Sequence, residues 1–305
     1  MKKNAFCAVL FVCLAVFLGC KSSGGVQPEP VEPLALLDGD SSIYLSIPAS
    51  KNAALVSKLL CSRISGLSEK DARQIAERTD SLYAGLGTVK DRSRIQVVSD
   101  TSVPKIALNS ALSKKNGWKK SAVTCGGFIF EKFTQVSGGF ELALSPSGIF
   151  CAAQDVAPLL QNCVLRTVAE DTPWNRWIGA ETDEIRFYIT KPGQYLRGLI
   201  GQPVSGVDAV YGSLRRTEKN QSETYLMSFY MHLADKRGAA ALRALLGLSF
   251  AMAGGSVSQT DDYTLMLSGV EVSVSQIESL FSRDPITGKH YKVLGDEVIE
   301  ESMPK

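Results

Sequence analysis

The two halves of this chain carry the same short patterns in the same order, and this repetition constrains the fold more than any other feature. The series begins where apolar and polar residues alternate at 42–47 and again at 184–189, as they do in half-buried strands. It ends with 140–145 and 263–268, the most similar pair. The pairs between them match 55–60 with 195–200, 80–86 with 208–214, 95–98 with 225–229, and 107–112 with 241–246. Because the order is kept throughout, the sequence predicts an internal duplication.

Each half is therefore expected to follow the order strand, helix, strand, strand, helix, strand, strand, helix (β-α-β-β-α-β-β-α). Gly148 and Gly269 mark tight turns between neighbouring strands, and such turns join antiparallel strands. We predict an α+β fold in which two similar halves build antiparallel sheets covered by helices. An additional helix is expected near 67–79, where Ser68 and Asp71 resemble a capping box. Strand order, and whether the halves form one core or two, stay open.

The first 20 residues are typical of an export signal that ends in a lipid attachment site. Lys2 and Lys3 precede an uncharged apolar stretch at 5–18, which is too short to span a bilayer comfortably. Cys20 follows Phe-Leu-Gly at 17–19, and a small residue before a Cys resembles the bacterial lipobox. Phe17 makes it similar to the looser spirochaete form. The resemblance implies cleavage after Gly19 and lipid on Cys20, palmitate included. An ordinary signal peptide or an uncleaved anchor is the alternative.

The signal and the repeat together divide the chain into segments. Residues 21–33 are polar and rich in Gly and Pro, and such a segment buries too little apolar surface to fold on its own. The predicted segments are a lipoprotein signal peptide (1–19), a flexible tether (20–33), a first α+β repeat (34–164), a connector (165–180), a second α+β repeat (181–281) and a polar C-terminal tail (282–305).

Removal of the signal also balances the charges of the chain. The full chain has 33 basic and 31 acidic residues, and Lys2 and Lys3 leave with the signal. A balanced mature chain has no overall electric field that would draw it to nucleic acid. We therefore expect no nucleic-acid partner.

The sequence lacks the motifs of common enzymes and metal sites. Its two His residues, His232 and His290, are far apart, and there is no GxSxG, GxxxxGK[ST] or HExxH motif, and no GxGxxG after a strand. The run 38–42 alternates oxygen-bearing side chains as calcium loops do, but it lacks the bidentate acid that completes such a loop. We expect no enzymatic activity, no catalytic residues, no metal site and no cofactor.

The cysteines after Cys20 define neither a redox motif nor a zinc site, because none has the spacing of either. An extracytoplasmic location permits disulfides, and free buried thiols are the alternative. Sequence alone does not choose among the three pairings. The residues concerned are Cys61, Cys125, Cys151 and Cys163.

A first candidate for lipid contact is the apolar stretch at 236–253. At helical spacing, Leu242, Leu245, Leu246 and Phe250 share one face, and the opposite face has mostly small residues. A helix this apolar is expected to be buried on two sides or to meet lipid. Burial between the two halves is the alternative to lipid contact.

A second candidate occupies the equivalent place in the first half, at 103–120. Its apolar residues are Ile106, Leu108 and Leu112, and Trp118 follows among lysines at 114–120. Lysines around a Trp suit an anionic headgroup layer, where each basic residue contributes about 1 kcal/mol. They suit a solvated helix end equally well. Because the two candidate helices are equivalent, we expect that they could open an apolar groove together.

These features loosely resemble treponemal outer-membrane-associated lipoproteins with amphipathic helices. The resemblance rests on the lipobox, on the character of the helices and on the α/β pattern. It implies a non-enzymatic envelope protein that is anchored through Cys20 and binds membrane, lipid or another apolar ligand. Lys21, in place of an Asp after the Cys, favours the periplasmic face of the outer membrane over the inner membrane. A scaffold that binds an envelope protein is the alternative function.

Overall fold

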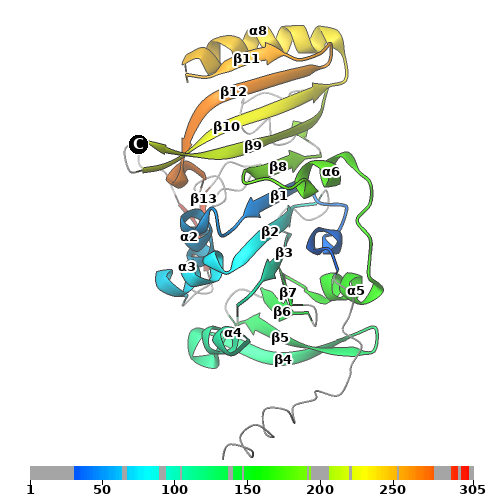
Figure 1. The fold of residues 1–305 in the computed structure, drawn as a ribbon, viewed down its shortest axis with the longest axis vertical. Helices are drawn as coiled ribbons and strands as arrows, with labels where there is room; N and C mark the ends of the chain where they lie inside the picture. The colour runs from blue at the N-terminus through cyan, green and yellow to red at the C-terminus, as the bar shows by residue number, and fades with distance from the viewer. Residues whose placement is uncertain are drawn as a thin grey trace, which may run out of the picture.

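The computed structural model describes residues 31–301, apart from 64–66, 89–93, 104, 137–139, 146–147, 191, 194–205, 220–221, 253, 278–289 and 295–296. Most described strands belong to one antiparallel sheet of 12 strands that runs along the molecule (Figure 1). Its order from one edge to the other is β11-β12-β10-β9-β8-β1-β2-β3-β7-β6-β5-β4. The remaining two strands, β13 (His290–Leu294) and β14 (Glu297–Glu301), pair with each other. The chain is thus α+β, as expected.

The strands of the first half are β1 (Ile43–Pro48), β2 (Thr79–Leu86), β3 (Ile95–Thr101), β4 (Trp118–Cys125), β5 (Phe128–Gln135), β6 (Glu141–Leu144) and β7 (Ile149–Ala153). Those of the second half are β8 (Ile185–Ile189), β9 (Val207–Lys219), β10 (Ser222–Leu233), β11 (Ser256–Gln259) and β12 (Thr264–Ser273). The helices are the 3₁₀ turns η1 (Pro33–Leu36) and η2 (Lys114–Asn116), with α2 (Ala53–Arg63), α3 (Glu69–Glu77), α4 (Lys105–Ala111), α5 (Ala157–Leu165), α6 (Pro173–Gly179) and α8 (Lys236–Met252).

The two halves meet in the middle of the sheet, where β1 pairs with β8 and Tyr44 lies opposite Tyr188. Pairing these strands satisfies the backbone groups that two separate sheets would leave open at their edges. The question that the sequence left open is thus answered: the two halves share one sheet. The connector also packs on the sheet, because Trp174 of α6 stacks on Tyr44 with ring centroids 3.7 Å apart.

Helices cover both faces of the sheet. Successive side chains of a strand point to opposite faces, so Ala152 packs under α4 while its neighbours Cys151 and Ala153 pack under α5. On β8, Ile185 and Phe187 lie on the same face, which carries α2 and α8. The face with η1, α5 and α6 is thus opposite to the face with α2, α3, α4 and α8.

The predicted additional helix is confirmed as α3. Its N-cap is Ser68, whose hydroxyl accepts a hydrogen bond from the backbone N–H of Asp71 at 3.1 Å. The same hydroxyl donates to the Asp71 carboxylate at 2.7 Å. Capping satisfies backbone donors at the start of the helix that would otherwise have no partner.

The segment 103–120 is not one helix followed by its solvated end. Helix α4 ends at Ala111, η2 follows, and Gly117 takes the left-handed conformation (φ +78°) that favours glycine. Strand β4 then begins at Trp118 itself. Sequence analysis missed this strand because it lies at the edge of the sheet and exposes residues on both faces, so apolar and polar residues do not alternate along it.

Candidate lipid-contact site

Helix α8 lies across β10, β11 and β12 at one end of the sheet (Figure 1). Ala239, Leu242 and Leu246 are buried against strand residues such as Leu265. Phe250 is half-buried, and its ring packs edge-on against Phe229 with centroids 5.9 Å apart. Leu242, Leu246 and Phe250 were expected to contact lipid, but they form the stripe that holds the helix on its own sheet. The alternative prediction, that this helix is buried between the two halves, is also wrong, because α8 lies at one end of the sheet (Figure 1).

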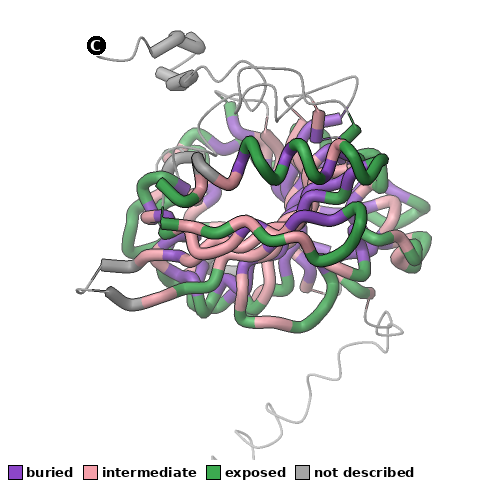
Figure 2. Tube along the Cα trace, turned by 90° about the horizontal axis from the view of Figure 1, so that it is seen from above, coloured by how far each residue is buried: buried purple, intermediate pink, exposed green. Residues whose placement is uncertain are grey.

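The outer face of α8 has a different composition. Leu245 is 61% exposed and Met252 is 84% exposed, and the other exposed apolar positions among the described side chains of α8 are alanines at 240, 241, 244 and 251. Buried and exposed residues alternate along this helix in Figure 2. No acidic residue occurs within α8, whereas Lys236, Arg237 and Arg243 are exposed. We call Leu245, Met252 and the alanines around them the α8 patch.

The start of α8 is fixed to the turn between β11 and β12. The Asp235 carboxylate accepts a hydrogen bond from the backbone N–H of Gly238 at 2.7 Å, which caps the helix. Lys236 Nζ lies 2.8 Å from the Asp262 carboxylate, and this hydrogen bond raises the pKa of Lys236. The α8 patch is therefore presented by a helix that is held at its first turn and along its inner face.

The second candidate residues are not exposed to lipid in this structure. Trp118 is only 1% exposed and packs with Leu112, Phe133 and Leu142 under α4. Leu108 is also buried, and the side chain of Ile106 lies outside the described residues. The expectation that Trp118 lies in a headgroup layer is wrong, because Trp118 starts an edge strand whose inner face belongs to the core.

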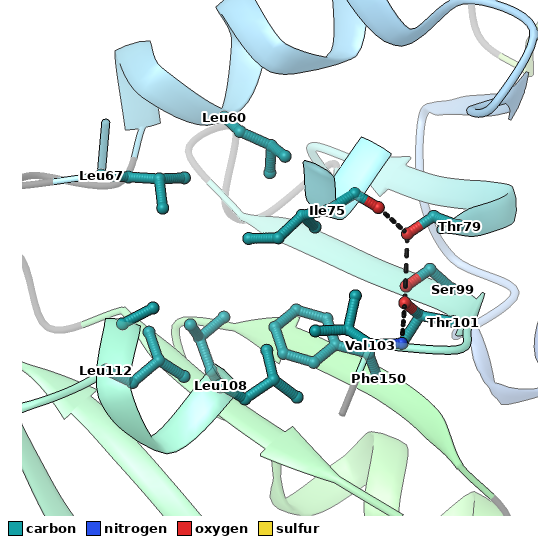
Figure 3. A pocket seen from close by; sticks show the side chains of 12 residues that line it. Leu60, Leu67, Ile75, Thr79, Ser99, Thr101, Val103, Leu108, Leu112 and Phe150 are labelled. Atoms are coloured by element: carbon teal, nitrogen blue, oxygen red, sulfur yellow. Dashed lines mark hydrogen bonds between the residues drawn. The ribbon is translucent and has the colours of Figure 1, made fainter. Parts of the chain in front are cut away.

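An apolar cleft lies between α4 and the α2–α3 pair (Figure 3). Leu60, Leu67 and Ile75 form one wall, and Leu108, Leu112 and Phe150 form the other. The Thr79 hydroxyl at its end donates to the Ile75 carbonyl at 2.8 Å, so little of this cleft is polar. The volume open to the centre of a water molecule is about 40 Å³. This is room for a few waters but less than a benzene-sized cavity of about 150 Å³.

A second hollow lies on the other side of α4. It is lined by Asn109, Ile129, Phe133, Leu144 and neighbouring residues, and it is larger, at about 320 Å³. The Asn109 Oδ1 atom is buried and has no hydrogen-bond partner among the described residues. The short helix α4 thus has open space on both flanks. Because α4 and α8 lie at opposite ends of the sheet (Figure 1), the groove expected between them is not present.

The carboxylates of the run 38–42 form ion pairs with an arginine of the protein itself. The Arg94 guanidinium pairs with Asp38 and with Asp40, and the Gln96 amide donates to Asp38 at 2.9 Å. Within the described part of the chain, no group of three potential ligands could hold a metal ion. These carboxylates therefore fix the entry to β1.

The cysteines and His232 are the remaining residues with reactive side chains. Cys61, Cys125, Cys151 and Cys163 are free thiols, and burial raises the pKa of Cys151 to about 12. His232 Nδ1 lies 3.2 Å from the Thr264 hydroxyl on the neighbouring strand, and the side chain of His290 lies outside the described residues. None of the described helices is long and apolar enough to cross a membrane.

Part of the chain matches the model of a known protein family. Residues 28–137 match the model of a family described as outer membrane-associated lipoprotein TP0453. This match covers little more than a third of the chain and ends before α8. It confirms the predicted resemblance to a spirochaete-type lipoprotein, and its description agrees with the expected localisation in the outer membrane. No curated protein matches the chain.

The solved structures that are similar to this chain include several crystal forms of TP0453. Crystal form I has a TM-score of 0.66 at 15% identity and covers 83% of this chain and 98% of that chain. Form III has a TM-score of 0.65 at 16% identity, with 83% and 98% covered. Form IV has a TM-score of 0.63 at 17% identity, with 85% and 100% covered. At this level of identity, the similarity establishes a shared fold.

Proposed function

We propose that this chain is a non-enzymatic lipoprotein of the outer membrane that is lipidated at Cys20 and contacts lipid or another apolar ligand through the α8 patch. The observation that carries the proposal is the exposure of Leu245 and Met252 on a helix without acidic residues. Exposed apolar side chains that lie together on one face are typical of an interaction site. The family description and the lipobox support attachment to a membrane.

The strength of this contact can be bounded from the exposed side chains. Full burial of a Leu or Met side chain is worth about 1.5–3 kcal/mol, and Leu245 and Met252 keep more than half of their surface exposed. Each nearby basic residue adds about 1 kcal/mol at an anionic surface. The α8 patch alone thus gives a weak, reversible contact. Stable attachment requires the lipid chains on Cys20 in addition.

The scaffold function is the second candidate, and one observation favours it. Strand β4 is an edge of the sheet and exposes most of its residues over its full length, Trp118–Cys125. The backbone groups of an edge strand can accept a strand from a partner. Lys119 and Lys120 on β4 oppose indiscriminate pairing, so a partner strand with acidic residues would suit it best.

The order of strands supports the proposed duplication. From the central pair β1–β8 outward, β2 and β3 correspond to β9 and β10, and α4 corresponds to α8. However, the strand beside β3 is β7, whereas the strand beside β10 is β12. The alignment of 140–145, which includes β6, with 263–268 is therefore not supported. The hairpin β4–β5 is then an insertion in the first half.

Vesicle flotation tests the proposed function. The mature chain with Cys20→Ala is mixed with neutral and anionic vesicles at low and high salt. We expect flotation with anionic vesicles, and we expect it to be lost in Leu245→Glu/Met252→Glu. The control is Val136→Glu, because Val136 is also an exposed apolar residue but lies just after β5, far from α8 along the sheet. Equal flotation of all three chains would contradict a role for α8.

A further inference from the structure

The end of the hairpin β4–β5 carries exposed apolar residues that the core does not use. Its turn is Gly126–Gly127, with both φ angles positive (+54° and +83°), and such a turn connects two antiparallel strands tightly. Directly after the turn, Phe128 is 59% exposed and Ile129 is 77% exposed. Because neighbouring residues of a strand point to opposite faces, the tip is apolar on both sides.

The last turn of α5 adds to this surface. A Cβ atom at Gly126 would lie only 2.4 Å from Val164 Cγ1, so the hairpin turn packs directly against the end of α5. Leu165 and Val168, which follow Val164, are exposed apolar residues as well. Half of the large hydrophobic residues that are exposed in the described part of the chain therefore belong to this region. We call Phe128, Ile129, Leu165 and Val168 the hairpin-tip patch.

The N-terminal end of the described chain packs on the same face of the sheet as α5. The Asn162 side chain of α5 donates a hydrogen bond to the Leu36 carbonyl of η1 at 3.0 Å. Val31 packs against the core cluster that contains α5. Leu165 is less than one helical turn beyond Asn162, a rise of about 4.5 Å along the axis. The chain that leads to the anchor thus starts on the sheet face that carries α5, and the end of α5 packs against the hairpin turn.

The length of that chain limits which surfaces can reach the membrane of the anchor. Val31 is the eleventh residue after Cys20, so fully extended chain spans at most ~40 Å between them. For the flexible tether that the sequence predicts, the average span over this length is about 18 Å. A tether this short gives surfaces near its end an effective concentration of about a millimolar at the bilayer. The tether therefore favours a weak apolar contact close to Val31, whereas a distant surface such as the α8 patch gains nothing from it.

We propose that the hairpin-tip patch lies in the same membrane that holds Cys20 and orients the anchored protein on it. This proposal rests on the proposed lipidation of Cys20 for its role in the cell. The occupant is the hydrocarbon region of a lipid bilayer, just beneath the headgroups. This region surrounds an inserted hairpin tip on all sides, so it can receive apolar residues from both faces of the tip. Helix α8 lies at the opposite end of the sheet (Figure 1), so the α8 patch is left available for a second lipid surface or ligand.

The test uses tryptophan reporters in a mature chain whose Cys20 is replaced by a hexahistidine held on nickel-chelating lipids. The vesicles contain lipids with brominated acyl chains, which quench a Trp that enters the bilayer. The reporter is Phe128→Trp. The matched control is Val136→Trp, an exposed apolar position just after the other end of β5. Fluorescence is read as the difference from the unsubstituted chain.

We expect vesicle attachment to quench Phe128→Trp about twofold or more and to leave Val136→Trp unchanged. Adding Ile129→Ser should reduce the quenching of Phe128→Trp. Absence of quenching at residue 128, or equal quenching at 128 and 136, would overturn the proposal. Because the hexahistidine replaces the lipid, this result does not depend on modification of Cys20 or on α8. Failure of the proposed function is therefore distinguishable from failure of this inference.

Discussion

The two ends of the sheet differ in how they use a similar helix. At one end, Leu108 of α4 and Leu112 just after it are buried, and Trp118 of the adjoining strand completes the core below them. At the other end, α8 has Leu242 and Leu246 buried and Leu245 exposed. Both helices therefore use their regular apolar stripe to hold the sheet. The candidate contact at α8 comes from additional apolar residues on the outer face, which α4 does not show among its described side chains.

This difference shows where a lipid contact is to be sought on such a helix. An apolar stripe at helical spacing is explained by packing on a sheet, and it says nothing about lipid. Exposed apolar residues outside the stripe have no such explanation within the fold. The comparison can be sharpened by variants that separate the inner face from the outer one.

The largest effect is expected at the end with α4. Trp118→Ala removes a fully buried indole and should lower the free energy of unfolding by about 3–5 kcal/mol. Chemical denaturation measures this loss. The fraction of folded chain that binds vesicles should stay the same, since Trp118 is in the core. A stable Trp118→Ala variant that no longer binds vesicles would contradict the assignment of Trp118 to the core.

Two adjacent leucines of α8 should differ nearly as strongly. Leu246→Ala is expected to lower the free energy of unfolding by about 2–4 kcal/mol, because Leu246 packs on the sheet. Leu245→Ala should change it by less than about 0.5 kcal/mol, as exposed positions usually do. Vesicle binding should show the reverse order, with Leu245→Ala more affected per folded molecule. Equal loss of stability in both would mean that α8 is turned differently on its sheet.

A change of pH should affect the first half through its buried thiol. The pKa of Cys151 is raised to about 12 by burial, whereas a Cys in the unfolded chain titrates near 8.5. The raised pKa contributes stability that is complete below the unfolded pKa and is lost as pH rises through the folded one. We expect a decline in unfolding temperature from about pH 9 to pH 12 that is weaker in Cys151→Ala. The same decline in both chains would exclude Cys151 as its cause.

The smallest effect is expected from the charges around the α8 patch. Arg243→Gln removes one exposed basic residue of α8 and should weaken binding to anionic vesicles by about 1 kcal/mol, or roughly fivefold. Binding to neutral vesicles should not change. Titration of vesicles at low salt measures both. An equal loss with both kinds of vesicle would show that Arg243 acts through the structure of the helix.

Local patterns in the sequence were sufficient for part of the fold. The capping residues Ser68 and Asp71 predicted α3, and Gly148 predicted the tight turn between the antiparallel strands β6 and β7. The order of strands was beyond such patterns, because β1 pairs with β8 across more than a hundred residues. Register between distant strands depends on packing that no short segment encodes.

The site was harder to predict for the same reason. Leu245 and Leu246 are neighbours in the sequence and both are leucines, yet only Leu245 is exposed. Spacing placed both on one broad apolar face, and only the position of the sheet divides that face in two. The tip residues Phe128 and Ile129 looked like an ordinary strand, since the sequence does not show that the hairpin extends beyond its neighbours. A strand start that is apolar at successive positions was the one available signal.

The most direct test of the central claim is the environment of Met252 in the presence of lipid. Met252→Trp in the mature Cys20→Ala chain is mixed with anionic vesicles whose acyl chains are brominated. If the α8 patch enters the bilayer, the fluorescence of this Trp shifts to shorter wavelength and is quenched, while the three native Trp residues give the unchanged background seen in the unsubstituted chain. If the chain floats with the vesicles but the Trp at 252 is neither shifted nor quenched, α8 does not contact lipid and the account is contradicted.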